Sequence, residues 1–290
     1  MTAVPPTKRA ETYASASTAL LELEQPKWTR LPIRTRPHRN PLAENDDVHP
    51  ECPMEFDQQL PEMYPMLKAE GCAGKKIEFL DVGCAFGGML FDLCAHFPDT
   101  LMLGLEIRGK VVDFAQKKAL ELREGAKNQV ASDGKFFHHY GNVWFDALNV
   151  MKYGSNCFEK GQLKKIFFCY PDPHWKKNNI RRRIISPGLV QEYAYWLEVG
   201  GLIYTVTDVE GLEQWMIQCL DDSPLFERLS DAEIESFSPN HSKVIQIVTS
   251  SSEDAQRTQR KGLTKNYAVH KRVSPATPAV FTGRRSVTEV

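Results

Sequence analysis

The sequence lacks the features of a secreted, membrane-bound or metal-holding protein. Its seven cysteines include no Cys-x-x-Cys pair, and its eight histidines show no spacing typical of a metal site. An odd cysteine number without such pairs indicates a reduced intracellular protein and not a disulfide scaffold. No apolar run reaches the roughly 18 residues of a membrane span, and the N-terminal residues lack the apolar core of a secretory signal. We therefore expect a soluble intracellular protein with no metal and no membrane contact.

The sequence also lacks an excess of charge of either sign. Its 36 Lys and Arg residues are balanced by 37 Asp and Glu residues, which leaves a net charge of −1. A polyanionic partner would therefore have to meet local patches. Three basic stretches stand out, at 27–39, 176–183 and 257–285. Each one alone is as often a solvated face as a binding site, but the three together favour a nucleic acid.

The chain is expected to divide into a tail, one folded domain and a second tail. Residues 1–55 are rich in proline and have no apolar period, so we expect a largely irregular N-terminal tail with a basic arm at about 27–43. A folded domain is expected over 56–273, and an irregular C-terminal tail over 274–290. The Pro-flanked charges of the arm fit a segment that lies along an acidic partner.

Short apolar runs alternate with helical patterns from residue 76 onward. Strands are predicted at 77–82, 101–105, 136–140, 166–170 and 202–207. Helices are predicted between them, at 89–96, 111–123, 145–152 and 187–197, and another ends near residue 220. This alternation indicates a mostly parallel sheet covered on both faces. Two late strands, 225–229 and 244–249, are expected to close its edge as an antiparallel pair, so the predicted fold is α/β: a Rossmann-like, doubly wound sheet of seven strands.

A glycine-rich loop, Asp81-Val-Gly83-Cys-Ala85-Phe-Gly87-Gly88, follows the first predicted strand. Small residues at this turn let backbone N–H groups approach a nucleotide-like ligand. A dinucleotide site would prefer Gly-x-Gly-x-x-Gly, whereas this loop is closer to the Asp-x-Gly-x-Gly-x-Gly pattern of S-adenosylmethionine-dependent methyltransferases. Ala85 stands at a usual glycine position, a departure that is tolerable if its backbone keeps a negative φ. An ordinary strand-turn-helix junction is the alternative.

Two polar residues after later strands support a nucleotide site. Glu106 lies 23 residues after Gly83, at the end of the second predicted strand, where a carboxylate can accept both ribose hydroxyls. Asn142 is expected after the third strand, where its amide would offer a donor and an acceptor to an adenine edge. A turn former beside Gly141 is an equally good interpretation of Asn142.

Asp172 follows the fourth predicted strand, and Pro171 and Pro173 restrict its backbone on both sides. Methyltransferases that act on exocyclic base amines use a related Asn/Asp-Pro-Pro-aromatic loop, and this sequence departs from it by placing His174 before Trp175, so another kind of target is expected. Guanine N7 would be such a target: it carries an in-plane lone pair, so its methylation needs in-line positioning and no general base. A carboxylate there would accept hydrogen bonds from the N1–H and N2–H groups of the base and stabilise the charge that develops on it. An Asp-Pro turn without chemistry is the alternative. Trp175 would either stack on a base or belong to the core.

Longer motifs make the interpretation specific. They are Tyr-Pro-Asp-Pro-His-Trp-Lys-Lys, Gly-Leu-Glu-Ile-Arg, Arg-Ile-Ile-Ser-Pro and the later Glu-Tyr-Ala-Tyr. From about Arg34 to about Val273 the chain resembles the tRNA (guanine-N7-)-methyltransferase family, most closely its eukaryotic catalytic subunit. The resemblance implies a methyltransferase domain, methyl transfer from S-adenosylmethionine to N7 of a variable-loop guanine in tRNA, and a WD-repeat partner subunit. It also implies a nuclear location, with the cytoplasm left open.

Carried over by position, the resemblance implies a set of site residues. The active-site acid would be Asp172. The cofactor contacts would be Gly83, Glu106, Arg108, Asn142, Val143 and Cys169. In the late segment, Ser252 and Asp254 stand where the family has Thr and Glu. The residues expected to bind RNA are Lys176, Lys177, Arg181, Arg34, Arg36 and His38.

Two other functions compete with methyl transfer. One is an RNA-binding subunit whose nucleotide site has decayed, with Ala85 and Asp254 as its symptoms. The other is an NAD-linked dehydrogenase on the same fold, which Ala85 and the absence of a paired catalytic His and acid make less suitable.

Overall fold

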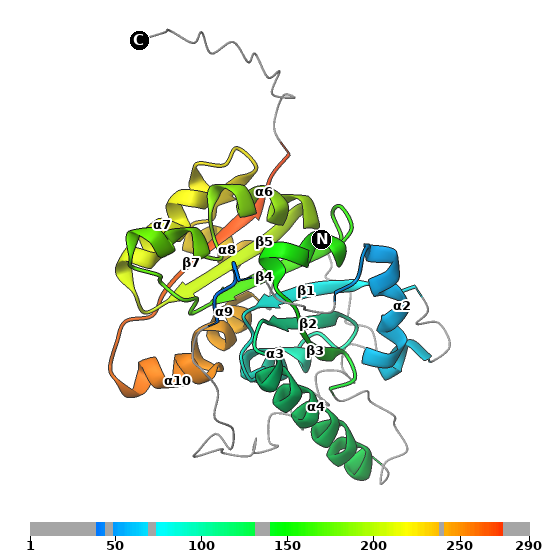
Figure 1. Ribbon diagram of the computed structural model, residues 1–290. Coiled ribbons are helices and arrows are strands. Elements are labelled where there is room, and N and C mark those ends of the chain that lie inside the picture. Colours follow the sequence, from blue (N-terminus) through cyan, green and yellow to red (C-terminus); the bar gives the residue numbers. More distant parts are fainter. Residues whose placement is uncertain (1–38, 44–48, 69–73, 131–139, 238–240, 275–290) are drawn as a thin grey trace, which may run out of the picture.

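The computed structural model describes residues 39–43, 49–68, 74–130, 140–237 and 241–274. Within them lies one sheet with the strand order β3-β2-β1-β4-β5-β7-β6 (Figure 1). The strands are β1 (Ile77–Val82), β2 (Leu101–Glu106), β3 (Val143–Ala147), β4 (Leu163–Cys169), β5 (Leu197–Thr207), β6 (Phe226–Arg228) and β7 (Asn266–Arg272). Strands β1 to β5 are parallel to one another, and β7 runs antiparallel between β5 and β6. The predicted doubly wound, mostly parallel sheet is confirmed.

The sheet has a switch point at β1. This strand pairs with β2 on one side and β4 on the other, so the chain winds outward in both directions from it. The loops that leave the carboxyl ends of β1 and β4 therefore turn to opposite sides, and the crevice expected between such loops is where open α/β sheets bind ligands. The glycine loop leaves β1 at Val82, and the segment that holds Asp172 leaves β4 at Cys169.

Helices cover both faces because successive strand residues point to opposite sides of the sheet. Leu80 packs in one apolar cluster and its neighbour Phe79 in the other. The helices of the first cluster are α2 (Pro53–Met63), α5 (Val150–Tyr153), α6 (Pro187–Trp196) and α7 (Glu210–Asp221). Those of the second are α3 (Gly88–Cys94), α4 (Gly109–Val130), α8 (Asp231–Phe237) and α9 (His241–Ser250). Three 3₁₀ helices complete the connections: η1 (Pro65–Lys68), η2 (Gly154–Asn156) and η3 (Lys177–Arg182).

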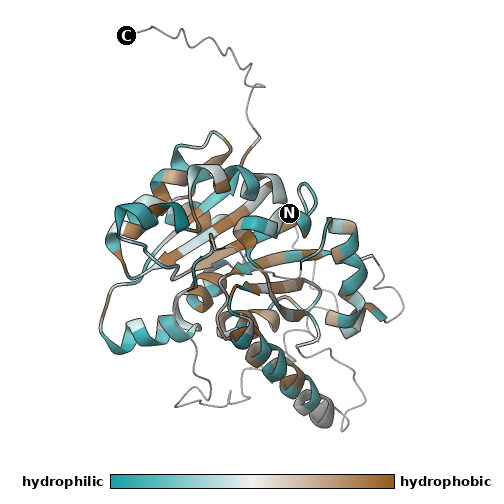
Figure 2. Ribbon diagram, in the orientation of Figure 1, coloured by the Kyte–Doolittle hydropathy of each residue, from teal (hydrophilic) through white to brown (hydrophobic). Residues whose placement is uncertain are grey.

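One further helix, α10 (Glu253–Arg260), differs from the others. It is hydrophilic along its length, whereas the strands are largely hydrophobic (Figure 2). Ala255 and Thr258 are its buried residues, so this helix packs on the domain through small side chains. None of the described helices is long and apolar enough to cross a bilayer.

The strand predicted at 136–140 lies outside the described residues except for Tyr140, and the helix predicted at 145–152 is wrong in position. Residues 131–139 lie outside the described residues, and Tyr140 stands in a turn with a φ of 59°. The third strand is Val143–Ala147, which pairs with β2, and the short α5 begins only at Val150. Both 136–140 and 143–147 are short aromatic-rich runs, which local pattern alone does not separate.

The second of the two late strands is also wrong. Residues 244–249 belong to α9, and the strand that pairs with β6 is β7. The run Val-Ile-Gln-Ile-Val-Thr is β-branched and strand-like in composition. However, its buried residues Val244, Ile247 and Val248 recur at three and four, which places them on one face of a helix. The strand predicted at 225–229 is confirmed as β6.

Candidate active site

The glycine loop is folded back on the end of β2 by its own backbone. The amides of Gly83 and Cys84 both donate to the carbonyl of Leu105, at 2.7 and 3.1 Å. Gly83 has a φ of 78°, and a Cβ on it would meet no heavy atom within 4 Å. At Gly87, with a φ of 80°, a Cβ would lie only 2.3 Å from the ring of Phe145. The loop therefore needs glycine at Gly87 for close packing and leaves open space beside Gly83.

Ala85 does not have the negative φ that would make alanine unstrained at this glycine position. Its φ is 47°, in the left-handed region, where a Cβ costs ~1–2 kcal/mol. The loop keeps its turn in spite of this residue because the flanking glycines take the other two left-handed positions. Ala85 thus strains the loop but does not prevent the loop from forming.

Glu106 ends β2 with a buried carboxylate that is already oriented. Its Oε1 accepts from the backbone amide and Nε of Arg108, both at 3.0 Å, and its Oε2 accepts from the guanidinium at 2.8 Å. These hydrogen bonds raise the pKa of Arg108, and the carboxylates of Asp172 and Asp254 act in the same direction. Arg108 therefore donates hydrogen bonds to Glu106, the expected ribose acid, and interacts electrostatically with Asp172, the expected active-site acid.

The segment after β4 holds Asp172 between two anchored points. The amide of Tyr170 donates to Val206 on β5 at 2.7 Å, and the buried Arg183 donates from Nε to the carbonyl of Pro173 at 2.8 Å. Tyr170 and His174 have φ values of 53° and 45°, which side-chain-bearing residues rarely adopt. A backbone held in such conformations on both sides of Asp172 is typical of a site whose carboxylate must stay in one place.

Residues 252–254, at the start of α10, lie at this same edge of the sheet. Ser252 caps α10 by accepting a hydrogen bond from the amide of Ala255 at 3.1 Å. Burial raises the pKa of Asp254, with Arg257 and Arg108 opposing and Asp208 and Asp172 reinforcing the shift. Asp254 therefore lies close enough to interact with both Arg108 and Asp172.

The predicted cofactor contact Cys169 lies on the same edge. Burial, followed by the negative charge of Asp81, raises the pKa of its thiol. The structure thus brings Gly83, Glu106, Arg108, Cys169, Asp172, Ser252 and Asp254 to the carboxyl edge of the sheet. Within the described ranges, no group of three His, Cys, Asp or Glu side chains is placed to hold a metal ion.

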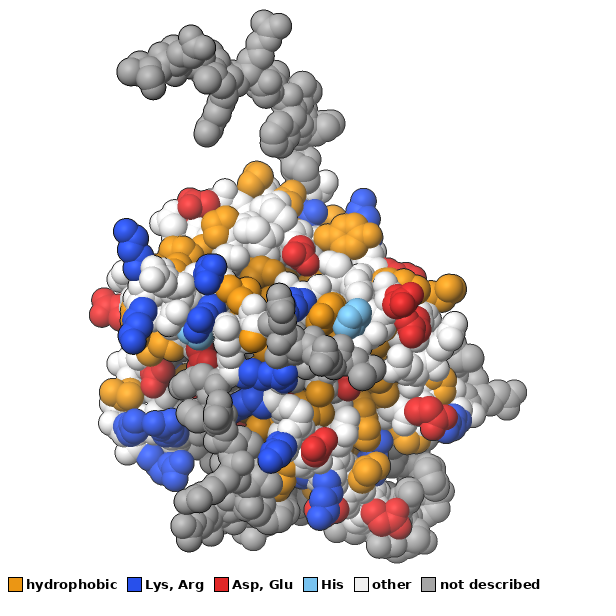
Figure 3. Space-filling view, in the orientation of Figure 1, with side chains coloured by type: hydrophobic (Ala, Val, Ile, Leu, Met, Phe, Trp, Pro, Cys, Tyr) orange, Lys and Arg blue, Asp and Glu red, His pale blue; other side chains and the backbone are white. Residues whose placement is uncertain are grey.

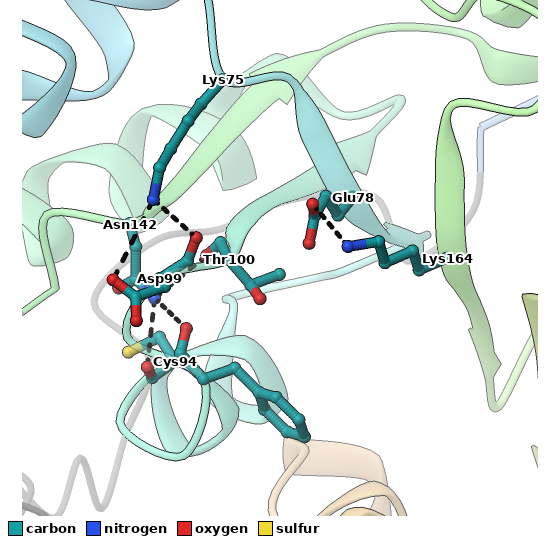
Figure 4. Close-up of polar contacts among 8 residues, drawn as sticks. Lys75, Glu78, Cys94, Asp99, Thr100, Asn142 and Lys164 are labelled. Atoms are coloured by element: carbon teal, nitrogen blue, oxygen red, sulfur yellow. Dashed lines mark hydrogen bonds and ion pairs between the residues drawn. The ribbon is translucent and has the colours of Figure 1, made fainter. Parts of the chain in front are cut away.

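Asn142 and Val143 do not belong to this edge. Asn142 precedes β3, at the amino end of the strands, and its Nδ2 donates to the carbonyls of Cys94, Phe97 and Thr100 at 2.9–3.1 Å. Figure 4 shows this amide among the backbone groups that follow α3. Val143 pairs with Met102 near the start of both strands. The expected adenine contact is therefore wrong, because the third strand follows Asn142 and does not precede it.

Asn149, which we did not predict, occupies the position at the carboxyl end of β3. Its Oδ1 accepts from the amide of Met151 and caps α5, and its Nδ2 donates to the carbonyl of Pro41 at 2.7 Å. Arg39 donates to the carbonyl of Ile107 at 2.6 Å, so this part of the basic arm lies against the end of β2. Asn before a short helical run is an N-cap signal that sequence reasoning could have used.

The expected RNA-binding residues fall into two groups. Lys176, Lys177 and Arg181 are exposed at or beside η3, just after Asp172. Lys and Arg side chains also gather on the side of the molecule where α10 lies (Figure 3), and Arg257 and Arg260 are exposed there. Arg34, Arg36 and His38 lie outside the described residues.

Comparison with known proteins agrees with this geometry. Residues 75–265 match a family model described as "Putative methyltransferase". A tRNA (guanine-N(7)-)-methyltransferase of Arabidopsis thaliana is 42% identical over 253 residues, which cover 86% of this chain and 94% of the relative. The chain belongs to the tRNA (guanine-N7-)-methyltransferase family. Relatives of the same description include one from Xenopus tropicalis, 40% identical over 83% of this chain and 93% of its own length, and one from Lodderomyces elongisporus, 39% identical over 87% and 78%.

S-adenosylmethionine is the cofactor of this methyltransferase, and the described residues fit it. The open space at Gly83, the oriented carboxylate of Glu106 and a buried Asp81 oxygen without a hydrogen-bond partner all lie around the glycine loop. Such unpaired polar atoms are costly unless a ligand uses them.

Proposed function

We propose that this protein transfers the methyl group of S-adenosylmethionine to N7 of a guanine in tRNA, and that the guanine lies in the variable loop. The observation that carries the proposal is the placement of Asp172. Its backbone is anchored on both sides, and its carboxylate interacts with Arg108, which holds Glu106 at the end of β2. One acid thus stands between the expected cofactor site and the exposed basic residues that follow it.

Different residues would orient the cofactor and the guanine. The bound cofactor supplies an electrophilic methyl group. The glycine loop and Glu106 orient its two ends, and Asn149 and Val150 take the place that sequence reasoning assigned to Asn142 and Val143. Asp172 accepts hydrogen bonds from the Watson–Crick edge of the guanine, which turns N7 towards the methyl group. Its negative charge also stabilises the positive charge that develops on the purine.

The tRNA is held by contacts to its phosphates. Lys176, Lys177 and Arg181 are exposed next to Asp172, and long basic side chains suit phosphate oxygens. Arg34, Arg36 and His38, which lie outside the described residues, are proposed to bind phosphates as well. A WD-repeat subunit as partner and a nuclear location follow from the family resemblance. Co-purification with that subunit and imaging of a fluorescent fusion test these two points.

Asp172→Asn keeps the size of the side chain and removes its charge. We expect transfer to guanine N7 to fall by about 100-fold or more, because the variant no longer places a negative charge against the transition state. Labelled cofactor and tRNA, with mapping of the methylated position, measure transfer, and calorimetry with S-adenosylhomocysteine measures cofactor binding. The exposed Asp113→Asn is the matched control.

Three outcomes separate the possible functions. Cofactor binding that is unchanged in Asp172→Asn, with transfer abolished, supports the holding role. Loss of both means that Asp172 serves the cofactor and contradicts that role. If the unaltered protein, with and without its partner, binds no S-adenosylhomocysteine and labels no guanine, the decayed RNA-binding subunit is correct.

A further inference from the structure

The side chain of Arg183 closes the loop that follows Asp172. Its Nε donates to the carbonyl of Pro173 at 2.8 Å, and its own amide donates to the carbonyl of Ile180 at 3.0 Å. The helix η3 lies between Pro173 and Arg183 in the chain. One side chain therefore joins the two ends of the loop 173–183, one residue away from the expected active-site acid.

The guanidinium of Arg183 lies over two indole rings. Its central carbon is 4.7 Å from the ring centre of Trp215 and 5.8 Å from that of Trp175. Trp215 belongs to α7, and its Nε1 donates to the carbonyl of Ile185 at 2.8 Å, which fixes the ring. A cation is attracted to the face of such a ring at these distances. Arg183 therefore attaches the loop 173–183 to α7.

Trp175 has a second contact with the same helix. A Cβ on Gly211 of α7 would lie only 3.2 and 3.3 Å from atoms of the Trp175 ring. Gly211 and Trp215 are four residues apart, so they lie on one face of the helix. This face thus supports Trp175 directly, and it supports Pro173 through Trp215 and Arg183.

Arg183 differs from the other basic residues of the run 176–183. It is 6% exposed, whereas Lys176, Lys177 and Arg181 are exposed. A buried guanidinium is badly placed to reach a phosphate of a large RNA. Its planar shape and fixed donors instead suit stacking on aromatic rings together with a hydrogen bond to a backbone carbonyl. The contacts of Arg183 therefore indicate a role inside the protein.

We propose that Arg183 is a positioning residue for methyl transfer, which holds the carboxylate of Asp172 and the ring of Trp175 in a fixed relation without touching the tRNA. The inference rests on the proposed function, because it assumes that Asp172 holds a guanine. Pro173 has a restricted backbone, so a hold on its carbonyl also limits the movement of Asp172. Methyl transfer needs in-line geometry, and a displacement of about 1 Å can cost about 100-fold in rate.

Arg183→Lys tests this role because it keeps the charge and removes the planar guanidinium with its Nε–H. We expect kcat to fall by about 10- to 100-fold. The KM for tRNA should change by no more than about 3-fold, since Lys176, Lys177 and Arg181 remain and Trp175 still rests on Gly211. Steady-state transfer from labelled S-adenosylmethionine to tRNA measures both constants. Calorimetry with S-adenosylhomocysteine should show unchanged cofactor affinity, which also reports that the variant is folded.

Arg123→Lys is the matched control. Arg123 is also a buried arginine over an indole, 4.8 Å from the ring centre of Trp144. It donates to backbone carbonyls near the amino ends of the strands, those of Met63, Tyr140 and Val143. We expect this control to lower the free energy of unfolding and to leave kcat within about 2-fold, at temperatures well below the transition.

Two further variants provide readouts that general loosening of the fold would not give. Trp215→Leu removes a ring beneath the guanidinium and should lower kcat without changing the KM for tRNA. Trp175→Ala and Arg183→Lys should be combined, with kcat measured at saturating tRNA. Because Arg183 acts on Asp172 and Trp175 together, we expect the combined loss in kcat to be smaller than the product of the two single losses.

The outcomes distinguish this inference from the proposed function. An unchanged kcat in Arg183→Lys, with or without a raised KM for tRNA, contradicts it, and a raised KM alone would make Arg183 a tRNA contact. An equal loss of kcat in Arg123→Lys means general loosening and contradicts it as well, as do fully independent losses in the double variant. If the unaltered protein methylates no guanine N7 in tRNA, the proposed function itself fails.

Discussion

At the scale of single residues, Trp175 shows how exposure changes an interpretation. Its side chain is 59% exposed, so it does not belong to the core. The outer edge of its ring lies 3.2 Å from the Cβ position of Gly211, and the guanidinium of Arg183 lies 5.8 Å from its centre. An aromatic side chain supported on one side and open on the other, three residues after Asp172, suits a stacked base.

Replacing Trp175 tests that stacking. We expect Trp175→Ala to raise the Kd for tRNA by roughly 5- to 100-fold, because stacking contributes about 1–3 kcal/mol per base. Trp175→Phe should retain most of the affinity, and binding of S-adenosylhomocysteine should not change. The control is Tyr195→Ala, an aromatic residue 50% exposed at the end of α6. An equal loss in the Phe variant, or no loss in the Ala variant, would rule out stacking.

At the scale of elements, one asparagine joins three parts of the sheet domain. Asn142, just before β3, donates to carbonyls of Cys94, Phe97 and Thr100, which lie at the end of α3 and in the connection to β2. Its own carbonyl accepts from Met102 at 2.8 Å. These bonds close the amino ends of the strands, on the opposite side from the active site.

Asn142→Ala separates the structural role from the predicted one. We expect the free energy of unfolding to fall by about 2–4 kcal/mol, since one buried and two partly buried carbonyls lose their donor. Affinity for S-adenosylhomocysteine should stay within about 2-fold at temperatures well below the transition, because the residue is far from the crevice. Urea denaturation and calorimetry measure the two quantities. A large loss of cofactor affinity in a fully folded variant would restore the original assignment.

Local pattern predicted most of the sheet and failed at 145–152 and at 244–249. Strands β1, β2, β4 and β5 follow from apolar runs bounded by turns, since each is buried on both faces. Residues 145–147 and 244–249 belong to runs in which β-branched or aromatic composition and periodicity disagree. Residues 244–249 form part of the helix α9 because a helix buries their apolar side chains on a single face against the sheet. The error at β3 then displaced the two cofactor contacts assigned to Asn142 and Val143.

At the scale of the whole molecule, charge is arranged by position and not by amount. The net charge is −1, yet exposed Lys and Arg residues follow Asp172 and occupy α10 (Figure 3). Six carboxylates lie around the crevice itself: Asp81, Glu106, Asp172, Asp208, Glu253 and Asp254. A basic rim around an acidic centre attracts the phosphates of an RNA while the centre receives a cationic cofactor.

The salt dependence of tRNA binding tests the rim. Changing Lys176, Lys177 and Arg181 together to Ala should weaken tRNA binding. It should also reduce the slope of log Kd against log salt concentration by about 2–3, because each phosphate that is no longer neutralised lowers that slope by about one. A filter-binding series from about 50 to 200 mM salt measures the slope. The control is the exposed Lys160→Ala, before β4 at the opposite edge. An unchanged slope in the triple variant would contradict phosphate binding by these residues.

The sequence by itself determined the parallel α/β sheet, the glycine loop, Glu106 and the acid between two prolines, because each depends on residues close together in the chain. Only the tertiary structure decided that Asn149, and not Asn142, stands at the carboxyl edge, because that depends on where β3 pairs with β2. It alone placed Glu253 over Gly88, 165 positions earlier. Such contacts arise from the order in which strands and helices pack, which local spacing does not contain.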